Sequence, residues 1–285
     1  MKDGIRRLKE NDFPELLRQI PDSPKKLFIE GPVPLSKSKL LCVVGSRHYS
    51  PYGKDVCERL ISGLSGYNVT IVSGLAIGMD SIAHRAAISA RLDTLAIPGS
   101  GLDPSVLYPA SHRALARQIV ERGGTLLSEF EPNTPAAPFT FPQRNRIMAG
   151  ISHATLVIEA TLKSGTLITA RLATDYNRDV LTVPHPIYSK TSRGPHMLLR
   201  LGATLIEKSE DILEALHIDL KKSSSLKRSL LSEDERKVID ALYHPLERDV
   251  LVKILGMPAR EVNVLLTAME IKGLIAERLG EIHIL

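Results

Sequence analysis

The residues best suited to chemistry in this chain are arginine, lysine and serine in short glycine-containing turns. Ser46 and Arg47 directly follow Gly45, after an apolar run and before a helical pattern. Glycine lets a ligand approach the backbone, arginine can donate two parallel hydrogen bonds to a phosphate, and free N–H groups at a helix start favour an anion. We interpret this turn as a phosphate-binding site. The alternative is a tight strand-to-helix turn with a solvated arginine.

A second cationic stretch, FTFPQRNRIMAG, spans residues 139–150. Arg144, Asn145 and Arg146 come shortly after Pro142. We therefore expect them at the start of a helix, where guanidinium and backbone N–H groups can face a phosphate chain together. The two phenylalanines of this stretch are candidates for stacking on bases, and a core position is an equally good interpretation.

Two further turns end apolar runs. Lys163, Ser164 and Gly165 precede another helical pattern, where backbone N–H groups and a hydroxyl can hold an anion. An ordinary helix cap is the alternative for this turn. Gly74 ends the second apolar run of the chain.

Other kinds of site are less well supported. Asp80 and His84 share one face of a predicted helix. We interpret them as residues that cap the helix and stabilise the adjoining loop, rather than as a general base or a pair of metal ligands. Cys42 and Cys57 lie in apolar patterns without zinc-ligand spacing, so we expect buried, reduced thiols. The G-x-G-x-x-G and Walker phosphate motifs are both absent. We predict no metal and no cofactor.

The elements that position these turns form a regular alternation from Lys39 to about Leu216. Apolar runs predict buried parallel strands, and the segments between them have helical spacing. The predicted strands are Leu40–Gly45, Val69–Gly74, Thr94–Pro98, Thr125–Ser128, Ala154–Glu159, Val180–Val183 and Thr204–Ile206. The pattern predicts an α/β fold with a Rossmann-like, doubly wound, mostly parallel sheet. Ligands of such sheets bind at the carboxyl ends of the strands.

The chain divides into four segments. Residues 1–38 carry one weak helical pattern, Phe13–Ile20, and several prolines, and we expect a shortened N-terminal lead-in. The Rossmann-like domain spans 39–218, and the Ser- and Lys-rich segment 219–231 is typical of a linker. Residues 232–285 contain three helical patterns and a hairpin pattern, which predict a small C-terminal winged-helix domain.

Charge is distributed unevenly along the chain. The 285 residues carry a net charge of +5, but the segment from Ser232 to the end is at −3 and the preceding part at +8. A site for a polyanion is therefore expected in the first part. No run of about 18 apolar residues offers a membrane span, and the N-terminus lacks the apolar core of a secretory signal. We expect a cytoplasmic protein without membrane contact.

Several motifs together resemble one known family. They are Gly45-Ser46-Arg47, SGLAIGMDSIAH (73–84), PGSGLD (98–103), Tyr108-Pro109, Ser128-Glu129, FPQRNRIMAG (141–150), SGTLITARLA (164–173) and Leu201-Gly202-Ala203. In this order and spacing they resemble the DprA/Smf family of DNA-processing proteins. The resemblance implies binding and protection of single-stranded DNA, help in loading a RecA-type recombinase during natural transformation, and no catalytic turnover.

The resemblance also implies where DNA binds. The expected DNA-binding residues are Ser46, Arg47, Gly74, Arg144, Asn145, Arg146, Ser164 and Gly165. We add Lys163 because of its charge and its place beside Ser164. The resemblance implies a homodimer through the α/β domain, near Met197–Leu201 and Ile206–Leu216. Pro195-His196 departs from the family pattern and can perturb only a local helix start. We expect an Arg47→Ala or Arg144→Ala substitution to weaken strand binding while the fold persists.

Two alternative functions belong to different classes. Nucleoside-monophosphate phosphoribohydrolases share a Rossmann-like sheet, but glycosidic hydrolysis needs acidic residues at the scissile bond. Here the turn 164–166 leads into a helical pattern with no acidic residue before Asp175. A regulator that reads duplex DNA with its winged helix would need many phosphate contacts, and the C-terminal segment is net negative. Single-strand binding without catalysis is the preferred hypothesis.

Overall fold

In a computed structural model the chain folds into two compact units, Met1–Ile218 and Asp219–Leu285. The structure describes residues 4–33, 38–219, 231–242, 246–278 and 280–284. Most of the predicted linker, 219–231, lies outside the described residues.

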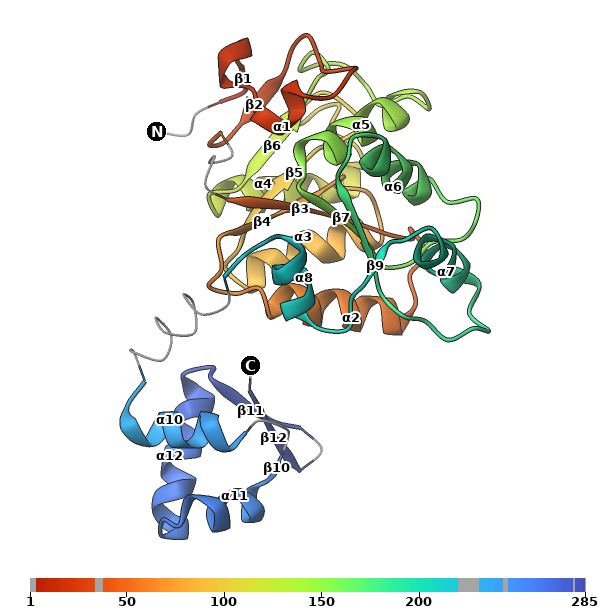
Figure 1. Ribbon diagram of the computed structural model, residues 1–285. Coiled ribbons are helices and arrows are strands. Elements are labelled where there is room, and N and C mark those ends of the chain that lie inside the picture. The colour runs from red at the N-terminus through yellow and green to blue at the C-terminus, as the bar shows by residue number, and fades with distance from the viewer. Residues whose placement is uncertain (1–3, 34–37, 220–230, 243–245, 279, 285) are drawn as a thin grey trace. The chain divides into compact units, whose positions relative to one another are not determined.

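The larger unit is built on one nine-stranded sheet in the order β1-β2-β6-β5-β4-β3-β7-β8-β9 (Figure 1). The strands from β3 to β9 pair in parallel, whereas β2 pairs antiparallel with β1 and β6. The bounds are β1 Arg6–Arg7, β2 Phe28–Glu30, β3 Lys39–Val44, β4 Val69–Ser73, β5 Asp93–Ala96, β6 Thr125–Ser128, β7 Ala154–Val157, β8 Asp179–Thr182 and β9 Thr204–Leu205. The predicted Rossmann-like, mostly parallel sheet is confirmed.

Helices cover both faces of this sheet (Figure 1). Apolar side chains of α2, α3 and α8 pack in one cluster with one face, and those of α1, α5, α6 and α7 pack in a second cluster with the other. The bounds are α1 Glu15–Arg18, α2 Pro51–Ser62, α3 Met79–Ser89, α4 Arg113–Glu121, α5 Thr140–Ile151, α6 Thr166–Asp175, α7 Arg193–Arg200 and α8 Ser209–Ala215. Among the described residues, no helix is long and apolar enough to span a bilayer.

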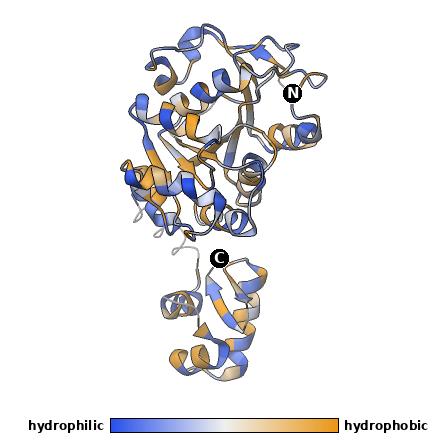
Figure 2. Ribbon diagram, turned by 90° about the vertical axis from the view of Figure 1, so that its right-hand side faces the viewer, coloured by the Kyte–Doolittle hydropathy of each residue, from blue (hydrophilic) through white to orange (hydrophobic). Residues whose placement is uncertain are grey.

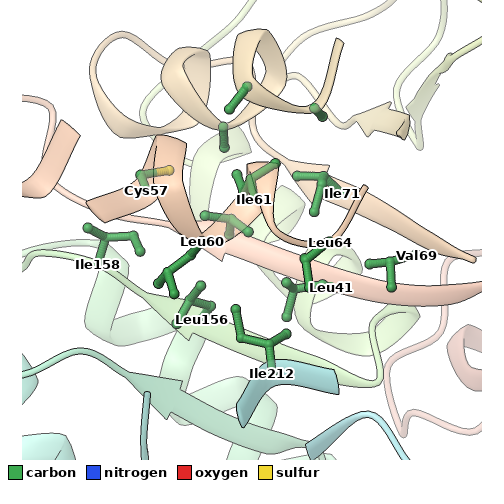
Figure 3. Close-up of a cluster of buried hydrophobic side chains, with 14 of the residues drawn as sticks. Leu41, Cys57, Leu60, Ile61, Leu64, Val69, Ile71, Leu156, Ile158 and Ile212 are labelled. Atoms are coloured by element: carbon green, nitrogen blue, oxygen red, sulfur yellow. The ribbon is translucent and has the colours of Figure 1, made fainter. Parts of the chain in front are cut away.

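The central strand β3 shows why the strands are apolar along their length. Leu41 and Val43 pack in the first cluster, while Leu40 and Val44 pack in the second. Strands covered on both faces need apolar residues at every position. Figure 3 shows Leu41 beside Leu64, which follows α2, in the first cluster. Along the helices, by contrast, hydrophilic and hydrophobic residues alternate (Figure 2).

Both cysteines lie in this interior. Cys42 and Cys57 are buried and free, as the sequence predicts. Burial raises the pKa of the Cys42 thiol to about 12, because a thiolate is poorly solvated there. Neither thiol is suited to nucleophilic chemistry.

The segment predicted as a lead-in, residues 1–38, is instead part of the larger unit. Its strand β2 extends the sheet by pairing with β6, and Leu17 and Ile20 of the α1 region pack in the core cluster with α5. The predicted helix Phe13–Ile20 is shorter, Glu15–Arg18. β1 consists of two arginines, and β2 is a three-residue strand between Pro24 and Pro32, so neither has the pattern of the longer buried strands.

The smaller unit has the predicted order of three helices and a hairpin. These are α10 Glu233–Ala241, α11 Arg248–Leu255, α12 Ala259–Ile271, β11 Ile275–Arg278 and β12 Glu281–Ile284, with a short β10 Leu246–Glu247 that pairs with β12. Ser232 caps α10 in a reciprocal box with Glu235, as its spacing suggests. The predicted end of this helix at Tyr243 lies outside the described residues.

Candidate nucleic-acid interface

The sheet has one point where its winding direction changes. From β3 the chain winds through β4, β5 and β6 on one side, and β7, β8 and β9 lie on the other. In doubly wound sheets, ligands bind in the crevice outside the carboxyl ends of the two strands at this point. Here this position lies between the loop after β3 and the loop after β7, and we call it the crevice below. A hydrogen bond from Thr166 Oγ1 to Gly45 O (3.0 Å) joins these two loops.

The loop after β3 presents a cation beside aromatic rings. Arg47 is exposed, and its guanidinium carbon lies 5.6 Å from the centre of the Phe141 ring. Phe141 in turn meets Tyr108 edge to face, with 5.7 Å between ring centres, and Tyr108 is 47% exposed. A guanidinium and exposed ring surface together suit a phosphate next to an unpaired base.

Ser46 contributes mainly to the shape of this loop. Its hydroxyl donates to His48 O (2.7 Å) and accepts from His48 N–H (3.0 Å). Its carbonyl accepts from Met79 N–H (3.1 Å) at the start of α3. The loop is therefore tied to itself and to α3, and Arg47 extends from a fixed backbone.

The start of α2 is not an open anion site, contrary to the prediction from the sequence. The N-cap Ser50 accepts from Gly53 N–H, and Pro51 has no N–H to donate. Glu159, fully buried at the end of β7, accepts from Ser50 N–H (2.9 Å) and from Ser50 Oγ (2.6 Å). This internal carboxylate occupies the position that an external phosphate would need. Sequence analysis missed Glu159, because its role depends on the pairing of β3 with β7.

The second cationic stretch is also placed differently from the prediction. α5 begins at Thr140, so Arg144 and Asn145 lie inside the helix rather than at its start. They are only 4% and 9% exposed, and Arg144 Nη1 donates to Ile97 O (2.6 Å). Pro142 is tolerated in the first helical turn, where no intrahelical N–H bond is lost. It therefore does not mark the residue before the helix.

Arg144 and Gly74 form a buried floor at the carboxyl ends of β4 and β5. The carboxylate of Asp80 accepts from Gly74 N–H (3.1 Å) and Ala76 N–H (3.4 Å). Burial raises the pKa of Asp80, and the nearby Arg144 cation opposes this most. A side chain at Gly74 would overlap the Arg144 guanidinium. Packing therefore requires glycine at position 74. The two hydrogen bonds that Asp80 accepts from the loop backbone agree with its interpretation as a residue that stabilises this loop.

Arg146 faces away from this floor. It forms an ion pair with Glu129, its Nη1 donates to Asp22 O (2.5 Å), and its Nε lies 3.7 Å from the Asp22 carboxylate. Residues two apart on a helix do not share a face, so Arg144 and Arg146 point to different surroundings. The predicted arginine cluster does not form. Arg146 instead fastens the N-terminal segment, which the sequence did not place in the fold.

The turn after β7 is open to solvent. Lys163 and Gly165 are exposed, and nothing lies within 4 Å of the position of a Cβ at Gly165. Ser164 Oγ donates to Thr166 Oγ1 (2.9 Å) and accepts from Thr166 N–H (3.2 Å). Of the predicted residues, the structure therefore brings Ser46, Arg47 and the 163–165 turn to the crevice. In the described ranges, no three His, Cys, Asp or Glu side chains are grouped to hold a metal ion.

Comparisons with known proteins identify the family of this chain. Residues 5–217 match the family model described as DNA recombination-mediator protein A, and residues 224–281 match that of the DprA winged helix domain. The chain belongs to the DprA/Smf family. Protein Smf of Escherichia coli is 38% identical over 273 residues, which make up 93% of this chain and 72% of Smf.

Solved DprA structures share the fold of the larger unit. The X-ray structure of DprA from Streptococcus pneumoniae is 37% identical, with a TM-score of 0.69 over 74% of each chain. DprA from Helicobacter pylori, whose structure was described for its mode of single-stranded DNA binding, is 28% identical, with a TM-score of 0.68 over 78% of this chain and all of that one.

The winged helix of this DprA/Smf member keeps much of its positive charge in internal pairs. Arg248 donates to Glu277 (2.7 Å) and to Asn263 Oδ1 (3.2 Å), and Lys272 donates to Glu235 (2.6 Å). A domain that reads duplex DNA uses such cations on phosphates. Because these cations are paired internally and the segment is net negative, sequence recognition of duplex DNA by the winged helix is disfavoured.

Proposed function

We propose that this DprA/Smf member binds single-stranded DNA in the crevice between the loops after β3 and β7. The observation that carries the proposal is the position of Arg47, exposed at the rim and lying over the Phe141 ring. Arg47 contacts a phosphate, the exposed turn at Lys163–Gly165 contacts the next part of the backbone, and the aromatic rings stack on bases. The H. pylori relative supports this choice of ligand.

The bound strand is protected and passed to a RecA-type recombinase in the cytoplasm, as part of natural transformation or recombination. The family description as a recombination mediator supports this step. The test is whether the protein lets the host recombinase assemble on strands already coated by single-strand binding protein. An Arg47→Ala variant should lose this effect together with strand binding.

Homodimer formation through the larger unit is part of the proposal. Leu201 at the end of α7 is 75% exposed, and Leu205 on the edge strand β9 is 44% exposed. The apolar residues of the second predicted region, such as Ile206 and Ile212, are fully buried and belong to the core. We therefore propose a dimer face formed by α7, which overlaps the first predicted region, and by β9, which lies between the two predicted regions.

Catalysis is not part of the proposed function. The two carboxylates nearest the crevice, Asp80 and Glu159, are 6% and 0% exposed, and both accept hydrogen bonds that hold loops. A phosphoribohydrolase needs a carboxylate that reaches the glycosidic bond. Incubation with nucleoside monophosphates should release no free base. Turnover that an Asp80→Asn or Glu159→Gln substitution abolishes would establish the enzyme alternative.

The deciding experiment is a fluorescence anisotropy titration with a labelled single strand and a duplex of equal length, over a range of salt concentrations. We expect tighter binding of the single strand, little sequence preference, and a salt slope of roughly −0.7 per phosphate contacted. Equal affinity for the duplex would refute the proposal. A double variant of the exposed Lys253 and Arg260 on the winged helix should bind the single strand normally.

A further inference from the structure

A turn between β8 and α7 exposes two large apolar side chains to solvent. Ser189 N–H donates to Pro186 O (3.1 Å), which closes a turn with Ile187 and Tyr188 at its centre. Ile187 is 73% exposed and Tyr188 is 93% exposed. Single exposed apolar residues are common, but an adjacent pair at the tip of a turn, where small polar residues are usual, calls for a binding partner.

The chain leading into this turn is fixed to α2. Tyr52 hydroxyl donates to Pro184 O (2.7 Å), and the Tyr52 ring packs edge to face on the His185 ring at 5.1 Å. His185 Nε2 lies 2.6 Å from Ile158 O, at hydrogen-bond distance. Because α2 follows the Arg47 loop directly, the turn is held by the same helix that supports the proposed DNA site.

The chain leaving the turn is fixed as well. Thr191 N–H donates to Ser189 Oγ (3.3 Å), and Thr191 Oγ1 donates to the buried Glu159 carboxylate (3.0 Å). The same carboxylate accepts from Ser50 at the head of α2. Tyr188 is thus presented by a backbone held at both ends, so little backbone entropy is lost when its ring binds a ligand.

The surroundings of Tyr188 favour a polyanion. Lys190 and Arg193 follow it closely, and Lys163 lies in the loop after the neighbouring strand β7. All three are exposed, and in the described part of the chain none has an ion-pair partner. The loops 158–165 and 183–192 contain one acidic residue, Glu159, and it is buried.

We propose that Tyr188 is a second stacking position for single-stranded DNA. A strand held at Arg47 and the 163–165 turn continues past the end of β8, where the Tyr188 ring stacks on an unpaired base and Lys190 and Arg193 contact its phosphates. Aromatic stacking and a cationic path are the two components of strand binding without sequence preference. This inference rests on the proposed function.

The first test uses a fluorophore that the chain otherwise lacks. The sequence contains no tryptophan, so a Tyr188→Trp variant carries a single one. Titration of the full chain with oligothymidylates of increasing length should quench its emission only when the strand is long enough to reach from the crevice. A Tyr67→Trp variant is the control, because Tyr67 precedes β4 at the amino edge of the sheet, and its emission should not change.

The second test measures affinity. Tyr188→Ala should weaken binding of long strands by roughly 5- to 100-fold, the range expected for one stacked base, and leave short strands unaffected. Ile271→Ala in the smaller unit, where the side chain is 83% exposed, is the control and should bind strands of every length like the parent protein. Tyr188→Ala binding long strands as tightly as the parent would overturn the inference. If Arg47→Ala also binds normally, the proposed function itself fails.

The Tyr188→Trp variant also distinguishes DNA from a protein partner. If its tryptophan emission stays unchanged with long strands but shifts when the host recombinase is added, the turn contacts protein. That result would overturn the assignment to DNA.

Discussion

The guanidinium of Arg47 lies over the ring of Phe141, 5.6 Å from its centre. Arg47 comes from the loop after β3, and Phe141 comes from the first turn of α5. The contact holds a charged group against an apolar surface at the rim of the crevice. The Arg47 guanidinium nevertheless stays exposed to solvent, whereas the Arg144 side chain is buried.

Arg47→Ala should lower the affinity for single-stranded DNA and make the salt slope shallower by about 0.7, because one phosphate contact is lost. Anisotropy titrations at several salt concentrations give both quantities. Arg171→Ala on α6 is the control, since that side chain is 86% exposed and has only a weak pair with Asp175 at 3.9 Å. An unchanged slope for Arg47→Ala would remove this residue from the site.

Arg144→Ala should destabilise the fold, in contrast to the expectation from the sequence. The guanidinium is buried, donates to Ile97 O and lies near the Asp80 carboxylate. Its loss leaves a buried anion without its nearby cation, which costs about 3 kcal/mol in the free energy of unfolding. Urea denaturation followed by circular dichroism measures this loss. Arg47→Ala should stay within about 0.5 kcal/mol of the parent, as exposed substitutions do.

Two glycines at the crevice should respond differently to alanine. Gly165→Ala should preserve stability, because open space surrounds the new methyl group, but weaken strand binding if DNA approaches this backbone closely. Gly74→Ala should unfold the protein more readily, because the methyl group would overlap Arg144. Thermal melts measure the effect of each substitution on stability, and anisotropy titrations measure its effect on strand affinity. Normal binding by Gly165→Ala would show that the strand passes elsewhere.

His84 should make stability depend on acid pH. It is fully buried beside Thr94 Oγ1 (2.7 Å), and burial lowers its pKa from 6.5 to about 3. A histidine whose pKa is lower in the folded state stabilises the fold above the unfolded pKa. This contribution is lost as pH falls from 6.5 toward 3, at about 1.4 kcal/mol per pH unit.

The measurement is urea denaturation at neutral pH and at pH about 5, where this histidine should cost about 2 kcal/mol of stability. In a His84→Gln variant the difference between the two conditions should shrink by that amount. An equally large difference in the variant would assign the acid sensitivity to other groups.

Leu201→Asp should convert the proposed dimer into a monomer. The side chain is 75% exposed at the end of α7, and a charge there would be desolvated in an apolar interface. Size-exclusion chromatography with light scattering gives the mass. Ile271→Asp in the smaller unit is the control, at 83% exposure. If Ile271→Asp gives a monomer and Leu201→Asp does not, the dimer interface lies on the winged helix.

The sequence predicted the seven parallel strands because most of them are apolar runs, which are typical of strands covered by helices on both faces of a sheet. The exception is β9, whose two residues are exposed. The sequence missed β1, which consists of two arginines, and β2, which is three residues long and lies between Pro24 and Pro32. Their pairing is set by a neighbour, β6, that lies far along the chain. A short strand is stabilised by its partner, so its own residues carry little signal.

By itself, the sequence determined the fold class, the family and the turns that end at the crevice. Only the tertiary structure decided which of the positively charged side chains at the crevice can contact a ligand. Arg47 is exposed, Arg144 is buried, and Arg146 is neutralised by Asp22 and Glu129. The physical reason is that burial and ion pairing of a side chain depend on groups distant in sequence, whereas residue type and spacing describe only its immediate neighbours.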